Sequence, residues 1–237
     1  MAVAHDAASE SATNSSVASF TVSHTPVGTP AGVLVYTYNF NSATNEATSV
    51  TYGAANVPAV TGGEAADTLN EPGSCKAWFL GSGVPTGAQT VTINRTNNTN
   101  TMYAIVITVT AGGDVEATGV VLQQENQAPA EASVDDGSPG TNSLRYAGAY
   151  CGLATVPGPG ANSTALHDVL VASTRSGSAV RETTAGQGAR SVGYSAATDD
   201  WACVALAIRE VAAASGRIFK LAGRGGGLAG ANIGLAG

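Results

Sequence analysis

Charged side chains are scarce in this sequence. Asp, Glu, Lys and Arg make up 11% of the 237 residues, where about a quarter is usual for a soluble domain. Exposed helices are built largely from Glu, Lys and Arg, so the composition argues against a helical protein. Gly, Ala, Ser, Thr and Asn are abundant instead, and small, β-branched and turn-forming residues favour a β-sandwich or a barrel.

Basic residues and long apolar runs are also scarce. Ten Lys and Arg oppose seventeen Asp and Glu, which gives a net charge of −7 without a basic cluster. A nucleic-acid surface needs concentrated positive charge, so we expect no nucleic-acid partner. Apolar runs such as "YAIVITV" (103–109) are too short to span a bilayer, and residues 1–14 lack the pattern of a secretory signal. We therefore expect no membrane partner.

Cysteines are few and do not form a recognisable pattern. Cys75, Cys151 and Cys203 are an odd number, each lies in an apolar stretch, and none forms a C-x-x-C pair. They are interpreted as buried free thiols rather than as a disulfide or metal site. A polar surface without a signal peptide or a disulfide framework is typical of a particle that assembles in a reducing cytoplasm and is released later.

What the sequence does contain is alternation of apolar and polar residues. It recurs in short runs from Ala18 to Glu210, for example in residues 32–40, 89–96, 102–110 and 201–210, and Gly-, Pro- and Asp-rich clusters separate the runs. This pattern predicts half-buried strands joined by tight turns, about eight to ten of them in two packed sheets. No internal repeat is evident in residues 1–210, which favours a single sandwich over two tandem copies.

No motif of a known catalytic class stands out. The sequence has no G-x-S-x-G, H-E-x-x-H, phosphate-binding loop or EF-hand loop. "GGGLAG" (225–230) matches G-x-G-x-x-G, but it lacks the following helix and the acidic residue that dinucleotide binding requires. We interpret it as low-complexity sequence and predict that the protein is not an enzyme and needs no cofactor.

Two groups of residues have an alternative chemical interpretation. Ser163, His167 and Asp168 are the residue types of a hydrolase triad, but closeness in sequence does not supply triad geometry, so the histidines are predicted to be structural. Asp135-Asp136-Gly137 and Asp199-Asp200 offer carboxylates for Ca²⁺. Asp-Gly is also the ordinary composition of a tight turn, and we favour the turn.

The tryptophans and one Asn-rich segment have alternative interpretations as well. Trp78 and Trp201 could stack on a sugar, but both lie in apolar runs and are predicted to pack in the core. "NRTNNTNT" (94–101) contains formal glycosylation sequons and is interpreted as a polar hairpin tip.

The last residues differ from the rest. In "KLAGRGGGLAGANIGLAG" (220–237), Leu-Ala-Gly recurs every seven residues at 221, 228 and 235. Glycine between the leucines excludes a coiled coil, which leaves a solvated linker or an extended arm that docks on another surface. We favour an assembly arm, since each buried Leu contributes about 1.5–3 kcal/mol. The predicted organisation is a body over 1–211 and a linker with arm over 212–237, whose anchors are Ile218, Phe219, Leu221, Leu228, Ile233 and Leu235.

Several motifs resemble those of a known family. They are "SFTVSH" (19–24), "ATSVTYGAANVPAV" (47–60), "CKAWFLGSGVPTGAQTVTINRT" (75–96) and "WACVALAIREV" (201–211). Together they resemble a jelly-roll-like β-sandwich domain that recurs in tailed-phage virion proteins and bacterial surface proteins. The resemblance covers roughly residues 6–211 and implies an all-β fold, a single antiparallel sandwich. It carries no active site.

The resemblance also implies a function. A domain of this type that forms almost the whole chain resembles a virion component more than a secreted protein. We expect a non-enzymatic capsid decoration protein of a tailed phage, assembled in the host cytoplasm and located in the virion. Its expected partners are the major capsid protein or other virion subunits and further copies of itself, with a trimer suited to three-fold sites. The alternative is a fibre or adhesin module that binds carbohydrate.

Overall fold

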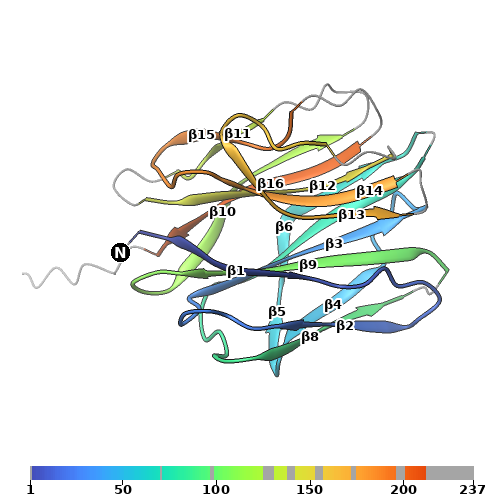
Figure 1. Cartoon of the computed structure of the whole chain (residues 1–237), viewed down its shortest axis with the longest axis horizontal. Coiled ribbons are helices and arrows are strands. Elements are labelled where there is room, and N and C mark those ends of the chain that lie inside the picture. The colour runs from blue at the N-terminus through green and yellow to red at the C-terminus, as the bar shows by residue number, and fades with distance from the viewer. Residues whose placement is uncertain are drawn as a thin grey trace, which may run out of the picture.

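The structure is a computed structural model of the chain, and it describes residues 2–69, 71–96, 99–124, 131–137, 142–152, 157–171, 175–195 and 201–211. Within these residues the chain forms sixteen β-strands and no helix. The strands pair antiparallel in sheets that stack in layers (Figure 1). The prediction of an all-β antiparallel sandwich is therefore confirmed.

The first half of the chain forms two sheets. Its inner sheet has the strand order β1-β9-β3-β7-β6, and its cover sheet has the order β2-β8-β4-β5. The strands are β1 (Ala4–Glu10), β2 (Ser19–His24), β3 (Gly32–Phe40), β4 (Ala47–Tyr52), β5 (Ala55–Val57), β6 (Ala59–Asp67), β7 (Gly73–Leu80), β8 (Gln89–Arg95) and β9 (Thr101–Thr110).

The second half forms a second inner sheet and a smaller cover. The inner sheet has the order β10-β16-β12-β14-β13, and a cover ribbon pairs β11 with β15. The strands are β10 (Val115–Gln124), β11 (Ala132–Asp135), β12 (Leu144–Cys151), β13 (Ser163–Val171), β14 (Arg175–Glu182), β15 (Ala189–Val192) and β16 (Trp201–Glu210).

The two halves have the same strand connectivity. In the inner sheets, β10, β16, β12, β14 and β13 occupy the places of β1, β9, β3, β7 and β6. The ribbon β11-β15 likewise repeats the pair β2-β8, while β4 and β5 have no counterpart among the described strands. The sequence shows no repeat, so this duplication was not predicted, and eight to ten strands in two sheets was too low a count.

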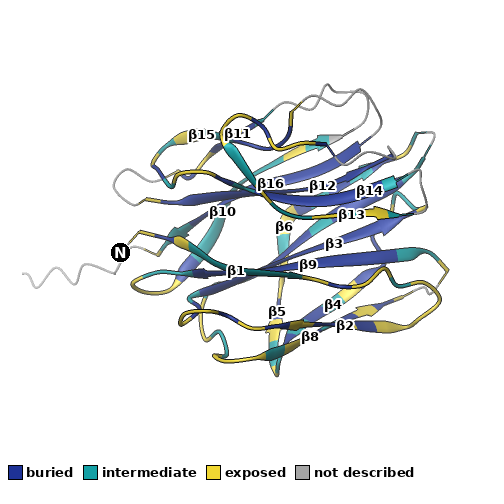
Figure 2. Cartoon of the chain, in the orientation of Figure 1, coloured by how far each residue is buried: buried dark blue, intermediate teal, exposed yellow. Residues whose placement is uncertain are grey.

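The layers enclose three hydrophobic cores. One lies between the two inner sheets, and one lies under each cover. In β3, Leu34 and Tyr36 face the other inner sheet, whereas Val33 and Val35 face the cover sheet. Figure 2 shows the central strands β3, β9 and β16 of the inner sheets buried along most of their length. The half-buried interpretation holds for the cover strand β2 but is corrected for inner strands such as β3, which are buried on both faces.

A reciprocal contact holds the inner sheets together. The Phe40 ring lies on Gly177 of the opposite sheet, and the Tyr150 ring lies on Gly73. The two rings meet edge to face, with centroids 5.6 Å apart. Phe40 is the register partner of Gly73, and Tyr150 is that of Gly177. Each aromatic thus packs on the glycine that pairs with the other aromatic, as the duplicated topology leads one to expect.

Candidate functional site

The predicted anchors of the assembly arm lie outside the described residues: Ile218, Phe219, Leu221, Leu228, Ile233 and Leu235. The boundary between residues 211 and 212 stays a prediction. The structure does show where the described chain reaches the surface. β16 ends at Glu210, the N–H of Val211 donates to the carbonyl oxygen of Asp114 at 2.9 Å, and Val211 is 47% exposed.

A surface groove begins one strand away from Val211. It lies where β6 and β10, the facing edge strands of the two inner sheets, come together, and its volume is about 350 Å³. Val115 of β10 lines the groove and is the register partner of Glu210. The apolar lining is completed by Val60, Phe79, Ala117 and Val120, and the polar lining by Thr61, Ser82 and Glu116.

The groove is open because both of its strands are irregular. The pairing of β6 with β7, and that of β10 with β16, each shift in register. The shifted segments contain Gly62 (φ 70°) and Gly119 (φ 62°), in the left-handed region that glycine tolerates. Val60, Thr61 and Val120 fall within them. Such bulges bend an edge strand away from its neighbour, which leaves the space between the sheets unfilled.

Acidic residues lie next to Val115, at the end of the groove that is nearest Val211. Asp114 is exposed, and Glu116, whose side chain is 45% exposed, accepts a hydrogen bond from Nε of Arg209 at 2.8 Å. The carboxylate of Glu210 accepts from the N–H of Gly112 at 2.5 Å. Three acids against one arginine make this end of the groove net negative.

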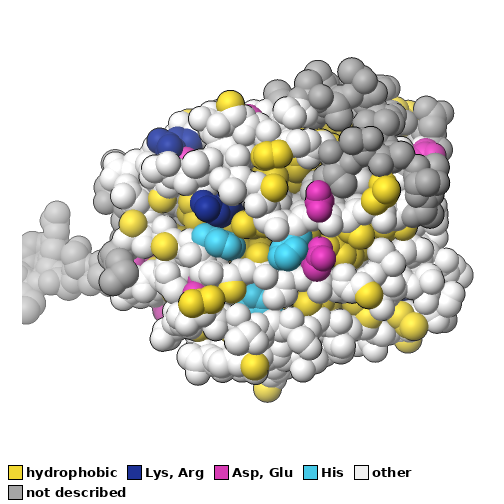
Figure 3. All heavy atoms as spheres, viewed as in Figure 1, with side chains coloured by type: hydrophobic (Ala, Val, Ile, Leu, Met, Phe, Trp, Pro, Cys, Tyr) yellow, Lys and Arg dark blue, Asp and Glu magenta, His cyan; other side chains and the backbone are white. Residues whose placement is uncertain are grey.

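The opposite seam, between the edge strands β1 and β13, contains polar contacts. Nδ1 of His167 lies 3.4 Å from a carboxylate oxygen of Glu10, which also accepts from the Tyr103 hydroxyl. Nδ1 of His5 lies 3.3 Å from the hydroxyl of Tyr146 in the other half. Figure 3 shows histidine side chains gathered in the middle of this face, with acidic and basic side chains beside them. The seam thus bonds the two halves to each other.

The third histidine extends this network toward the cover sheet. Nδ1 of His24 lies 3.0 Å from Oγ of Ser9, and Nε2 lies 3.1 Å from Oγ1 of Thr108. Burial lowers the pKa of His24, and burial, with the nearby charge of Arg181, lowers the pKa of His5 to about 4. His5 is therefore a neutral hydrogen-bonding group at pH 7.

The structure does not assemble the triad that Ser163, His167 and Asp168 would need. Ser163 and His167 stand four residues apart on β13, roughly 13 Å along an extended strand. Oγ of Ser163 instead accepts a hydrogen bond from the N–H of Gly193 at 2.9 Å. His167 is paired with Glu10, so its contacts are those of a structural residue.

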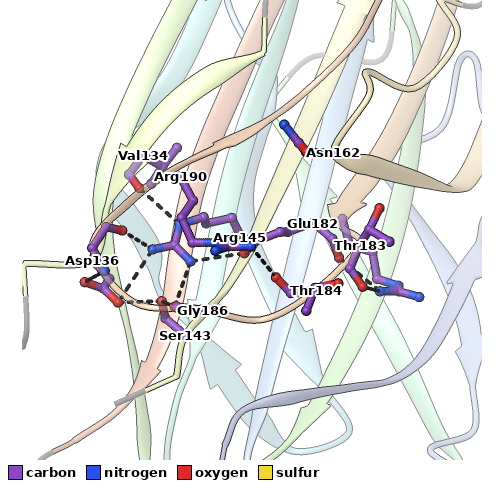
Figure 4. Close-up of polar contacts among 12 residues, drawn as sticks. Val134, Asp136, Ser143, Arg145, Asn162, Glu182, Thr183, Thr184, Gly186 and Arg190 are labelled. Carbon is purple, nitrogen blue, oxygen red and sulfur yellow. Dashed lines mark hydrogen bonds and ion pairs between the residues drawn. The ribbon is translucent and has the colours of Figure 1, made fainter. Parts of the chain in front are cut away.

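A buried charge network lies under the cover ribbon (Figure 4). Arg145, which is fully buried, donates to a carboxylate oxygen of Glu182 at 3.0 Å and lies 3.6 Å from Asp136. Its guanidinium also donates to the carbonyl oxygens of Val134 and Gly186, each at 3.0 Å. Every side of this cation meets an oxygen, which is the condition for a buried charge to be tolerated.

Of the four aspartates considered for Ca²⁺, Asp135 and Asp136 have other partners. The carboxylate of Asp136 accepts from the Ser143 hydroxyl at 2.6 Å and from the N–H of Gly188 at 3.2 Å, besides facing Arg145. Asp135 accepts from the N–H of Gly137, whose φ is 66°. The turn interpretation of 135–137 is confirmed. Asp199 and Asp200 lie outside the described residues.

The tryptophans and cysteines are in the interior, as predicted. Trp78 is 4% exposed in the core under the cover sheet, and its indole N–H donates to Thr37 at 3.0 Å. Trp201 is 1% exposed in the core under the cover ribbon. Neither indole can stack on a sugar. The three cysteines are buried, and none of them forms a disulfide: Cys75, Cys151 and Cys203. Burial raises the pKa of Cys203 to about 12, so its thiol is unreactive.

The Asn-rich segment is not a hairpin tip, because it joins two different sheets. β8 ends at Arg95 in the cover sheet, and β9 begins at Thr101 in the inner sheet. The described part of the connection is bound to the body: Asn100 donates to Glu46 at 2.6 Å, and Arg95 donates to the same carboxylate at 2.5 Å.

Comparison with known proteins leaves the family undecided. No protein-family model, no curated protein and no solved structure matches this chain. Among the described residues there is no helix that could cross a membrane, and no cluster of three or more His, Cys, Asp or Glu side chains suited to a metal ion. The resemblance to phage and bacterial surface domains stays a prediction.

Sequence reasoning missed both seams between the halves. For the groove a signal existed: "TGGEA" (61–65) and "ATGV" (117–120) place glycine inside strand-like runs, which marks a bulge. For the histidine seam none existed, because His5, His24 and His167 come together only through the long-range stacking of the sheets.

Proposed function

We propose that this protein is a non-enzymatic structural subunit of a virion surface. It acts as a decoration or cement protein on a tailed-phage capsid, where it binds capsid subunits and neighbouring copies of itself. The body is a stiff spacer, since its inner strands are buried on both faces. Residues 212–237 are the part that fastens it, through the leucines of the Leu-Ala-Gly repeats.

The position of Val211 is the observation that carries this proposal. β16 is fixed in the inner sheet by β10 and β12, and Val211, the residue that follows it, is 47% exposed at the margin of the body. A segment attached there can reach a neighbour without disturbing any of the three cores.

The distribution of charge supports a division between body and arm. Residues 212–237 contain three basic residues, Arg217, Lys220 and Arg224, and no acid. The other 211 residues hold seven basic and seventeen acidic residues and therefore carry a charge of −10. A basic, leucine-bearing segment is suited to binding an acidic surface, either on its own body or on that of another copy.

The test replaces the three repeat leucines, Leu221, Leu228 and Leu235, with serine in the full chain. Because the arm is predicted to bind through these side chains, we expect a folded monomer, while the wild type is an oligomer by light scattering at the same concentration. The matched control replaces Ala222, Ala229 and Ala236 with serine and should remain oligomeric. A leucine variant that assembles like the wild type would show that the arm does not fasten the protein. Purified virions should in addition contain the protein at a fixed stoichiometric copy number.

A further inference from the structure

We propose that the groove between β6 and β10 binds Ile218 and Phe219 of the same chain. This goes beyond the proposed function, because it assigns the start of the arm to the chain's own body and leaves only the repeat leucines for neighbours. Four features carry it: the shape of the groove, its apolar lining, its distance from Val211 and the charges around it.

The groove has the size and chemistry for these two side chains. Its volume of about 350 Å³ lies at the low end of the range for ligand pockets, roughly 300–1,000 Å³. Phe79 and Val115 form a floor that is 8% and 4% exposed. The bulged residues Val60 and Val120 form the walls and are only partly covered. An aromatic and a branched side chain that enter here bury their own apolar surface and that of the walls.

The groove is within reach of the chain's own arm. Six residues, 212–217, separate Val211 from Ile218, and they can span about 20 Å when extended. The groove starts at Val115, directly across from Glu210, and neighbouring strands lie about 4.8 Å apart. The connection is therefore long enough to reverse and enter. A short tether gives an effective concentration on the order of millimolar, which favours the chain's own arm over that of a second copy.

The charges around the groove match those of the segment. Arg217 and Lys220 flank Ile218 and Phe219 in "RIFK". Glu116 lines the near end of the groove and is paired with Arg209, while Asp114 precedes the groove residue Val115 in sequence and Glu210 is its register partner. When Ile218 and Phe219 are in the groove, Arg217 and Lys220 lie on either side of them, close to these acidic residues. The Leu-Ala-Gly repeats then leave the body along the β6/β10 seam, which fixes the direction in which the arm meets a neighbour.

Disulfide trapping in the full chain tests the assignment. Ser82→Cys places a thiol on the exposed rim of the groove, and Ala222→Cys places one three residues beyond Phe219. Under mild oxidation we expect an internal disulfide, seen as a faster-migrating monomer on a non-reducing gel. The control pair is Thr48→Cys with Ala222→Cys, in which the cysteine at position 48 lies on the cover sheet. The internal disulfide should form at least about tenfold faster in the Ser82 pair than in this control pair. The natural cysteines do not interfere, because they are buried.

Two further variants separate this inference from the proposed function. Phe219→Ser, which lies outside the described body, should abolish the internal disulfide, whereas replacing Leu228 and Leu235 with serine should leave it intact even if assembly is lost. A covalent dimer in place of the internal disulfide would mean that the groove receives a neighbour's arm. Equal trapping rates for the Ser82 and Thr48 pairs would mean that the groove does not receive the arm. Either result overturns the inference, and neither one bears on the leucine test of assembly.

Discussion

The two halves of the molecule share one connectivity but are covered in different ways. The first half has a four-stranded cover sheet, and the core beneath it is built mainly from Val, Ile, Phe, Tyr and Trp. The second half has only a two-stranded ribbon, and most residues of its core are Ala, Cys or Val. The ribbon is held by the Arg145 network.

The difference teaches how a narrow cover is kept in place. Small side chains bury little apolar area, so the hydrophobic contribution of the ribbon is modest. The ribbon is held instead by the buried Arg145. It forms ion pairs with Asp136, which follows β11, and with Glu182 at the end of β14, and these directional contacts fix the position of the ribbon. Ion networks of this kind specify one arrangement rather than adding much net stability, but they are costly to break.

The largest effect should come from breaking that network. Arg145→Ala leaves Asp136 and Glu182 buried without their shared cation and should lower the free energy of unfolding by about 3–5 kcal/mol. Val35 occupies the equivalent position under the cover sheet, since Leu34 pairs with Ile107 as Leu144 pairs with Ile208. Val35→Ala should cost about 2 kcal/mol. Urea unfolding measures both, and a smaller loss for Arg145→Ala would contradict the contrast between the covers.

A second pair of variants sharpens the reciprocal contact between the inner sheets. A methyl group at Gly73 would lie 2.2 Å from the Tyr150 ring, whereas one at Gly177 would lie 3.2 Å from Phe40. Gly73→Ala should therefore cost about 2–3 kcal/mol, because the ring has to move, and Gly177→Ala about 1 kcal/mol or less. Thermal unfolding distinguishes the two. Equal losses of stability for the two variants would contradict the tighter packing of Tyr150 on Gly73 than of Phe40 on Gly177.

The histidine seam predicts a smaller, pH-dependent effect. The pKa of His5 is about 4 in the folded protein and 6.5 when solvated, so the unfolded chain binds more protons between these values. The contribution of His5 to the free energy of unfolding should be constant above pH 6.5. Below pH 6.5 the free energy of unfolding should fall as the pH drops toward 4. His5→Gln, which remains neutral and can bond Tyr146, should reduce this fall. The measurement is the change in unfolding free energy between pH 7.5 and pH 4.5, and an unchanged difference in the variant would contradict the role given to His5.

The smallest effect concerns the rim of the groove. Glu116 and Arg209 form an ion pair whose side chains are 45% and 22% exposed. Glu116→Gln should lower stability by less than about 1 kcal/mol, and the loss should shrink further in high salt. A larger loss, measured by urea unfolding at low and high salt, would mean that this ion pair between β10 and β16 is more than a solvent-screened surface contact.

Local patterns predicted the strands well, and they missed the stacking for a physical reason. Alternation in residues 32–40 and 201–210 identified β3 and β16, and the burial of Trp78, Trp201 and the cysteines followed from their apolar neighbours. In 32–40 both faces carry apolar residues, Val33 and Val35 on one face and Leu34 and Tyr36 on the other. A strand that is half-buried needs apolar residues on one face only, so this pattern was a sign of burial on both faces. The duplication stayed hidden because only the core pattern is kept, for instance Leu34 and Tyr36 against Leu144 and Tyr146.

The candidate sites divide in the same way. The turn at 135–137 is local and was predicted, whereas the partner of Asp136 is Arg145, whose position depends on the packing of β12 under the ribbon. The groove and the histidine seam arise where edge strands of different sheets meet. Glycines in 61–65 and 117–120 marked the bulges of the groove strands, but no sequence pattern encodes which edge strands come together.

A cryo-electron microscopy map of the intact assembly tests the central claim most directly. We predict that Leu221, Leu228 and Leu235 rest in apolar pockets of a neighbouring subunit, while Ile218 and Phe219 fill the groove of their own body. If those leucines contact only their own body or solvent, with no second subunit within reach, the arm does not bind neighbouring subunits and the central claim is wrong.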